Sequence, residues 1–325
     1  MQLVGIVRKV PEHGHLSLKS CSGEGVMADT TAIRMPQDLL EGPVGKPMSY
    51  WQLVWWRLRR DKVTLGAASV IVMILLAAVL APYLTAYEPF QGSIRKRLLA
   101  IGSPGHILGT DEQGRDMLTR LLYGGRMSLT VGVTPVCVAL LVGATLGILA
   151  GFAGKRVNMV IMRTMDIFYA FPSVLLAIAI SGALGAGIGN TIVALSIVFT
   201  PPITRIAESV TTQVRAWEFM EAARASGAGA LAIIRHHMLA NVLAPIFVYA
   251  STLVSVSVIL ASGLSFLGLG ASPPAPEWGL MLNTLRQSIY VNAWVPALPG
   301  VMIFITSMSF NLLSDGLRDA MDVRL

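Results

Sequence analysis

The residues of this sequence that are best placed to make a specific contact form one charged segment, "EFMEAARASGAGALAIIRHHMLAN" (218–241), in a chain that is otherwise mostly apolar. Its first half has apolar residues at helical spacing, with Glu221 and Arg224 on an adjoining face. The stretch Gly-Ala-Gly (227–229) then breaks the helix, and the apolar spacing resumes after it. The segment therefore predicts a short helix, a glycine turn and a second helix that leads into the next apolar run.

The chemistry that this segment offers is surface contact rather than catalysis. Several small residues gather in its first helix and allow a second protein surface to approach closely: Ala222, Ala223, Ala225 and Ser226. The same pattern also fits a solvated connector whose basic end lies at a membrane surface. His236 and His237 are candidate ligands or part of that basic end, and the sequence leaves both interpretations open.

No motif for catalysis or nucleotide binding accompanies the segment. The chain has no G-x-x-x-x-G-K-[ST], H-E-x-x-H or G-x-S-x-G, and "GAGIGN" (185–190) lacks the strand–turn–helix context of a dinucleotide site. His13, His15 and Cys21 lie in a polar stretch, while Cys137 lies in an apolar run and is expected to pack there. We therefore expect no catalytic residue, no metal site and no cofactor in this chain.

The elements that must position the segment are apolar. The chain is 54% hydrophobic and 13% charged, with a mean hydropathy of +0.65, whereas soluble domains are about 25% charged. This composition predicts an integral membrane protein. The net charge of +7 comes from basic residues that flank apolar runs, which suits loops at an anionic lipid surface rather than a nucleic-acid-binding face.

Charge-free runs predict six membrane-spanning helices, because a span needs about 20 apolar residues. The predicted spans are 63–86, 129–152, 166–185, 190–208, 241–266 and 295–314. Lys and Arg are more frequent in the loops that would be inner if the N-terminus were inside, which favours an N-in, C-in arrangement. The fold class is therefore an all-α polytopic membrane protein with an inner loop at about 208–240, between spans four and five.

The N-terminal part is expected to precede the bilayer. Residues 1–48 are polar, contain Gly and Pro, and predict a disordered tail; Met27 or Met35, as well as Met1, is a possible start. Residues 49–62 combine Trp with Arg and Lys and predict an interfacial amphipathic helix. The transmembrane domain then covers 63–325.

Few ionisable residues occur in the predicted spans. Asp166 and Arg205 sit near span ends, and no carboxylates are paired at mid-membrane. Ion-coupled transporters usually keep costly charges there for ion relay. The sequence therefore favours a protein that opens and closes a path while energy and selectivity come from elsewhere.

The loop "GTDEQGRD" (109–116) has residues suited to capping and ion pairing. Thr110 or Asp111 can cap a helix, and Arg115 and Asp116, which follow Gly114, can form ion pairs. The loop either locks the structure or contacts a partner, and both readings stay open.

Two further positions carry local signals in or beside the spans. Phe171 and Pro172 predict a break or kink in the third span, either static or part of a gate. Trp278 follows a proline-rich turn and suits an anchor at the membrane interface.

"EAARASG" (221–227) resembles the EAA loop of the membrane subunits of ABC importers, E-A-A-x-x-x-G followed by a hydrophobic stretch that ends near L-P. Glu221, Ala222, Ala223 and Gly227 match that motif, and Arg224 lies within it. Ala240 stands where proline is usual, and His237 where an apolar residue often sits. The resemblance implies that this segment is a coupling helix that fits a groove on a separate ATPase subunit.

The resemblance extends over nearly the whole chain after about residue 50. Four further stretches are similar to the dipeptide, oligopeptide and nickel permease subfamily: 108–132, 166–180, 262–282 and 310–324. It implies a type I importer permease fold in the bacterial cytoplasmic (inner) membrane. The implied partners are a second similar permease, two ATPase subunits that bind ATP and Mg²⁺, and an extracytoplasmic substrate-binding protein, which the 109–116 loop would be able to contact.

Two other classes remain as alternatives at this level. One is an ion-coupled secondary transporter or channel that works alone, and the other is a membrane assembly or receptor protein that binds a soluble partner without transport. The substrate is not specified either: a dipeptide, an oligopeptide, glutathione, a nickel chelate and an opine all fit a path with few charges, whose selectivity comes from a binding protein.

Overall fold

The computed structural model describes residues 50–321. The predicted tail over 1–48, with His13, His15, Cys21 and the possible start residues, lies outside the described residues. Residues 50–321 are mostly helical and contain no β-strand. The helices are α1 (Tyr50–Arg60), α2 (Lys62–Val79), α3 (Ala81–Leu84), η2 (Ile94–Lys96), α4 (Met117–Phe152), α5 (Lys155–Tyr169), α6 (Ser173–Leu184), α7 (Ile188–Arg215), α8 (Glu218–Ala225), α9 (Ala230–Ile233), η3 (Ile234–Met238), α10 (Leu239–Phe266), α11 (Trp278–Leu285), η4 (Arg286–Tyr290) and α12 (Trp294–Met321).

Five stretches of helix are long and apolar enough to cross a membrane: α2, α4, α7, α9 to α10, and α12. The α5–α6 pair is a sixth candidate only if the two bent helices count as one span. The break or kink that Phe171 and Pro172 predict in the third span (166–185) is confirmed, because α5 and α6 meet at 87° there. Pro172 explains the break, since proline disfavours a helical conformation in Phe171 and has no N–H to donate.

The centre of the bundle is the contact between α4 and α7. Gly143, Gly147 and Gly151 form a stripe on α4 at intervals of four residues, and they face Ile203, Ala207 and Thr211 of α7. A methyl group added at Gly147 would lie 2.4 Å from the Cβ of Ala207. The glycines thus let the two backbones approach closely, which is a common way to pack helices where the hydrophobic effect does not drive association.

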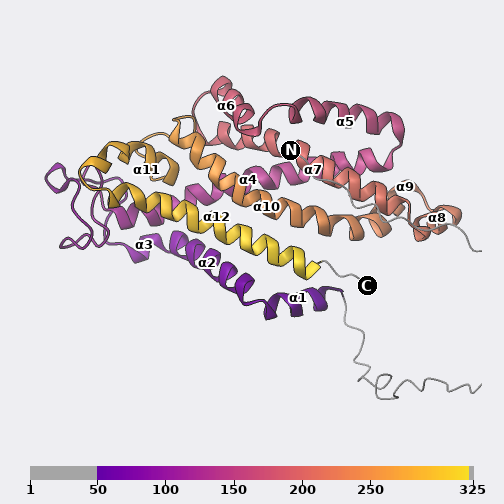
Figure 1. Cartoon of the computed structure of the whole chain (residues 1–325), viewed down its shortest axis with the longest axis horizontal. Helices are drawn as coiled ribbons and strands as arrows, with labels where there is room; N and C mark the ends of the chain where they lie inside the picture. Colours follow the sequence, from indigo (N-terminus) through magenta and orange to yellow (C-terminus); the bar gives the residue numbers. More distant parts are fainter. Residues whose placement is uncertain (1–49, 322–325) are drawn as a thin grey trace, which may run out of the picture. The chain divides into compact units, whose positions relative to one another are not determined.

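Helix α10 packs against both α4 and α7, and α12 packs against α10 and α2 to complete the bundle (Figure 1). The Ser314 hydroxyl of α12, which is buried, lies 2.6 Å from the hydroxyl of the partly buried Thr252 of α10. Thr64 near the start of α2 packs against Gly316 of α12, where a Cβ would clash. Side-chain hydrogen bonds and close contacts at small residues therefore join these spans.

The two ends of the bundle differ. Helices α8 and α9 lie at one end, and α3 and α11 lie at the other, together with the loop that connects α3 to α4 (Figure 1). Helix α1 packs on α12 and is joined to α2 at Asp61, whose carboxylate accepts hydrogen bonds from Val63 N and from the Thr64 hydroxyl. Both hydrogen bonds lower the pKa of Asp61, and the bond from the Thr64 hydroxyl makes the larger contribution.

Candidate functional site

The segment of interest is α8 and the turn after it, residues 217–229, called the α8 segment below. Met220 is fully buried in the bundle core and anchors α8. After the turn, Ile233 and Met238 are also buried in that core. Glu218 and Glu221 lie in the first turn of α8 and Arg224 lies in its last turn. Their charges interact favourably with the positive and negative ends of the helix dipole, respectively. The α8 segment is therefore held to the spans by apolar anchors on both sides.

The turn after α8 has the geometry of a Schellman motif. Gly227 has a φ of +78°, its N–H donates to Arg224 O at 3.0 Å, and Ala228 N–H donates to Ala223 O at 3.2 Å. Ala223 and Ala228, partly buried, both pack against the core. Glycine is favoured at this left-handed position because it has no Cβ. The predicted helix, glycine turn and second helix are confirmed by this geometry.

The outer face of the α8 segment is open to solvent. Among the residues expected at this site, Glu221, Ala222, Arg224 and Gly227 are exposed, and Ala223 is partly buried. Exposed apolar side chains flank them: Trp217, Phe219 and Leu231. A firmly anchored helix with small and charged residues on its free face, bordered by exposed aromatic rings, is suited to bind another protein.

The second helix enters α10 without a break. Residues Ile234–Met238 form one π-helical turn that continues directly into α10, with Ala240 in the first turn of α10. His236 and His237 are exposed, and the His237 ring lies 6.4 Å from the Phe219 ring. No group of three or more His, Cys, Asp or Glu residues suited to a metal ion occurs in residues 50–321.

The loop between α3 and α4, together with the first turn of α4, contains a buried set of ionisable side chains, called the loop cluster below: His106, Asp111, Arg115, Asp116 and Arg120. Each of these side chains is at most 5% exposed. Asp111 accepts from Arg115 Nε at 2.6 Å and lies 3.3 Å from Arg120 Nε. Arg120 also donates to the carbonyl oxygens of Pro89 and Pro274. The cluster thus ties the loop to the turn before α11.

Asp116 is the residue that caps α4. Its carboxylate accepts from Thr119 N at 2.8 Å and from the Thr119 hydroxyl at 2.7 Å, and lies 3.0 Å from Nδ1 of His106. The expected cap at Thr110 or Asp111 is therefore wrong. Thr110 instead forms hydrogen bonds with the backbone of Leu99 and Lys96 inside the loop. Helix α4 begins at Met117, which is earlier in the sequence than residue 129, the predicted start of the span.

Gly114 fits the loop tightly. Its φ is +72° and a Cβ there would lie 1.9 Å from Ser93 O.

Sequence reasoning missed His106 and Arg120, because their partners lie in the loop and in the turn before α11, and spacing along the chain does not show such contacts.

The break between α5 and α6 exposes aromatic and charged groups. Phe171 and Pro172 are exposed there, and Tyr169 is 54% exposed. One helical turn before the break, Asp166 forms an ion pair with Arg205 of α7. The structure brings together two charges that sequence analysis placed separately near span ends.

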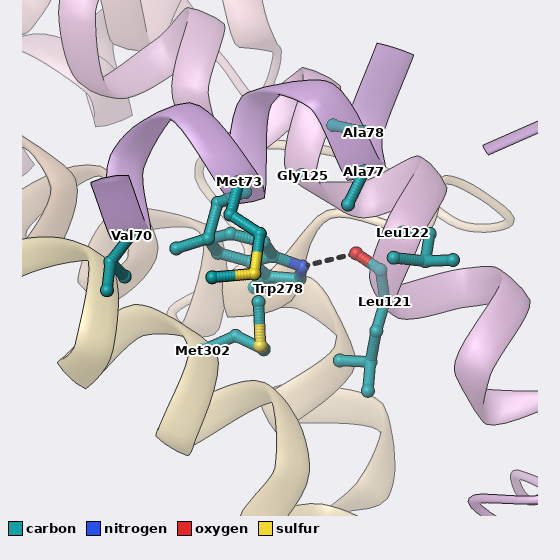
Figure 2. Close-up of a pocket in the computed structure, with 10 residues that line it drawn as sticks. Val70, Met73, Ala77, Ala78, Leu121, Leu122, Gly125, Trp278 and Met302 are labelled. Carbon is teal, nitrogen blue, oxygen red and sulfur yellow. Dashed lines mark hydrogen bonds between the residues drawn. The ribbon is translucent and has the colours of Figure 1, made fainter. Parts of the chain in front are cut away.

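An apolar cavity of about 210 Å³ lies between α2, α4, α11 and α12. Figure 2 shows the Trp278 ring beside Met73 and Met302, with its indole N–H directed at Leu121 O, a hydrogen bond of 3.0 Å. Trp278 is fully buried, so its expected role as a membrane-interface anchor is wrong. Gly124 and Gly125 of α4 leave the space that the tryptophan fills.

The fold and these sites define a helical membrane protein of several spans with an exposed segment suited to a protein partner. Residues 143–325 match the model of the family described as "Binding-protein-dependent transport system inner membrane component". Residues 49–100 match the N-terminal transmembrane domain of oligopeptide transport permease C. The chain belongs to this family of inner membrane components of binding-protein-dependent transport systems.

Relatives with curated names are similar over most of their length. A dipeptide transport system permease of Alkalihalophilus pseudofirmus is 41% identical over 86% of this chain and 91% of its own. A glutathione transport system permease of Pectobacterium atrosepticum is 39% identical over 85% and 91%. A di/tripeptide transport system permease of Pseudomonas aeruginosa is 40% identical over 83% and 91%.

A solved structure supports the fold. The MetNI methionine ABC transporter in an inward-facing conformation has a chain with a TM-score of 0.53 and 20% identity, over 63% of this chain and 97% of that one. The likeness to this structure shows the fold. The family and the curated relatives show that this chain is the permease subunit of an ABC importer and not an enzyme. The alternatives of a transporter or channel that works alone and of a non-transporting receptor are not supported.

Proposed function

We propose that this chain forms half of the translocation path of an ATP-driven importer for peptides or peptide-like solutes. The relatives named above carry dipeptides, di- and tripeptides, and glutathione, which are all short peptides with a free carboxylate. The second half of the path is a similar permease. A substrate-binding protein outside the bacterial cytoplasmic membrane delivers the solute.

The α8 segment is the contact for the ATPase subunits in this proposal, and its end of the bundle is cytoplasmic. The single observation that carries the assignment is the combination of a free, small-residue face at Glu221–Gly227 with fully buried anchors at Met220 and Met238. A push on the exposed face is transmitted to α7 and α10 because the anchors leave little room for independent movement. ATP and Mg²⁺ bind to two separate ATPase subunits, whose closure moves the spans between two states.

A cross-linking experiment tests the contact. Cys21 and Cys137 are replaced by Ser, and Ala222→Cys carries a photoreactive maleimide in the assembled importer. Ser272→Cys, also exposed but near α11, is the matched control at the other end of the bundle. Cross-links to an ATPase subunit are expected from Ala222→Cys alone. Cross-links from neither position, or labelling of Ala222→Cys from outside the cell, contradict the proposal.

A second experiment tests coupling. Gly227→Trp strains a left-handed residue and places a large ring on the contact face, so ATP hydrolysis should continue while uptake falls at least tenfold. Gly102→Trp is the control, because Gly102 also has a positive φ of 84° and open space around it, but lies in the loop between α3 and α4. Normal uptake by Gly227→Trp contradicts a coupling role. ATP turnover by the purified chain alone contradicts the division of labour.

A further inference from the structure

An exposed ion pair lies on two of the candidate spans. Arg205 Nη2 of α7 and Asp166 Oδ1 of α5 are 2.5 Å apart, and their side chains are 50% and 40% exposed. Helix α7 is a candidate span by itself, and α5 is the first half of the bent pair. The loop cluster, by contrast, buries all its charges. The exposure of a charged pair on a membrane span therefore needs a different explanation.

The position of the pair along α7 is close to one limit of the membrane core. Arg205 is 17 residues after Ile188, the first residue of α7, or about 26 Å along the helix axis. The hydrocarbon core of a bilayer is about 30 Å thick. Exposure of charges to lipid tails is costly, and an arginine near the limit of the core can reach the aqueous interface. The face of α7 that bears Arg205 therefore borders water, lipid headgroups or protein.

The same face of α7 stays polar as far as α8. Ser209, Thr212 and Gln213 are exposed on it, and Gln213 donates to the Ser209 hydroxyl at 3.3 Å. The opposite face is the one that packs against the glycine stripe of α4. A polar strip thus runs from the ion pair to the end of the bundle that carries the α8 segment, as expected for the wall of an aqueous path.

The ring of Tyr169 lies beside the cation of the pair. The Arg205 guanidinium lies 4.9 Å from the centre of the Tyr169 ring, which stabilises the cation. Tyr169 ends α5 at the break, and Phe171 is exposed two residues later.

We propose that Asp166 and Arg205 bind the charged ends of a zwitterionic peptide on its way through the permease, a proposal that rests on the function proposed above. Arg205 takes the peptide carboxylate and Asp166 takes the ammonium group, so the protein ion pair opens and the peptide replaces it. An exposed pair contributes little stability, which makes this exchange easy. A solute with only one of the two charges leaves one protein charge without its partner and passes less readily.

Direct binding tests the site without the binding protein. The complete permease–ATPase complex in nanodiscs is mixed with millimolar Ala-Ala, and saturation transfer from protein to peptide is measured by NMR. Wild-type protein should transfer saturation to Ala-Ala and much less to its C-terminal amide. Arg205→Gln should lose the signal and Arg205→Lys should keep part of it, because a charge-assisted hydrogen bond is worth roughly tenfold or more in affinity. Arg163→Gln, on the exposed surface of α5, is the matched control and should behave as wild type.

Uptake by the full importer gives the second readout. At saturating loaded binding protein, Arg205→Gln should lower the maximal rate of Ala-Ala uptake about tenfold, and Asp166→Asn should also lower it. The charge-exchanged double variant, Asp166→Arg with Arg205→Asp, separates substrate contact from a structural pair. If that variant restores uptake, the two residues only hold each other and the proposal is overturned.

Two other outcomes are decisive. Wild-type uptake of Ala-Ala with unchanged uptake by Arg205→Gln overturns the site and leaves the proposed function intact. No ATP-driven uptake of any short peptide by the wild-type importer overturns the proposed function itself. Cross-linking of Ser209→Cys to the second permease, with no reaction toward a water-soluble thiol reagent, shows a subunit interface and also overturns the site.

Discussion

The region of the loop cluster and the α8 segment contain the same kinds of residue but place them in different environments. Each has a carboxylate, a glycine with positive φ and a hydroxyl within a few residues of one another. Asp111 of the loop cluster and the neighbouring Gly114 and Thr119 are buried, and the Asp111 carboxylate and the Thr119 hydroxyl form hydrogen bonds inside the protein. In the α8 segment Glu221, Gly227 and Ser226 are exposed. Burial, and not residue type, separates a group that supports the fold from one that is free for a partner.

The largest expected difference concerns the carboxylates. Asp111→Ala should lower the free energy of unfolding by about 3–5 kcal/mol, because it removes the buried carboxylate that pairs with Arg115 and Arg120. Glu221→Ala should change it by no more than about 0.5 kcal/mol, as is usual for exposed positions. Thermal unfolding in detergent, followed by tryptophan fluorescence, measures both.

Asp111→Asn keeps the shape and the bonds to backbone N–H groups, and should lie between wild type and Asp111→Ala. If Asp111→Ala unfolds at the temperature of Glu221→Ala, the charges of the loop cluster do not support the fold and the comparison fails.

The glycines give the next effect in size. Gly114 and Gly227 have φ of +72° and +78°, and an alanine in that region costs roughly 1–2 kcal/mol at either site. At Gly114 the added Cβ would also lie 1.9 Å from a backbone oxygen, whereas nothing lies within 4 Å at Gly227. Gly114→Ala should therefore be clearly less stable than Gly227→Ala in the same unfolding assay. Equal losses would show that the loop backbone can move away and is not locked.

The sequence predicted features that depend on neighbouring residues. The helix, glycine turn and helix of residues 218–241 depend on helical spacing and on Gly227, which are both local. Apolar runs likewise located most spans, although the ends moved: α4 begins at Met117 and α7 continues to Arg215, because polar residues extend these helices beyond the apolar part.

Features that depend on distant segments were missed. Trp278 looked like an interface anchor, yet it is buried because two glycines of α4 make space for it. The His106–Asp116 contact and the Asp166–Arg205 pair join residues whose proximity no spacing rule reports. The roles of individual residues in coupling and in the path remain predictions for the experiments above.

The smallest expected difference concerns the hydroxyls. Thr119→Val removes a buried bond of 2.7 Å to the Asp116 carboxylate while it keeps the side-chain shape, and a lost bond to a charged group costs roughly 1.5–3 kcal/mol. Asp116 keeps its hydrogen bond from the Thr119 N–H at 2.8 Å and its contact with His106 at 3.0 Å, so the lower end of that range is expected.

Ser226→Ala removes an exposed hydrogen bond of 2.8 Å to Ala222 O, which still accepts the Ser226 N–H at 3.0 Å. Its effect on unfolding should stay below about 0.5 kcal/mol. A larger loss for Ser226→Ala than for Thr119→Val would mean that the α8 segment depends on its surface hydrogen bonds for stability, and would remove the basis for treating its free face as available to a partner.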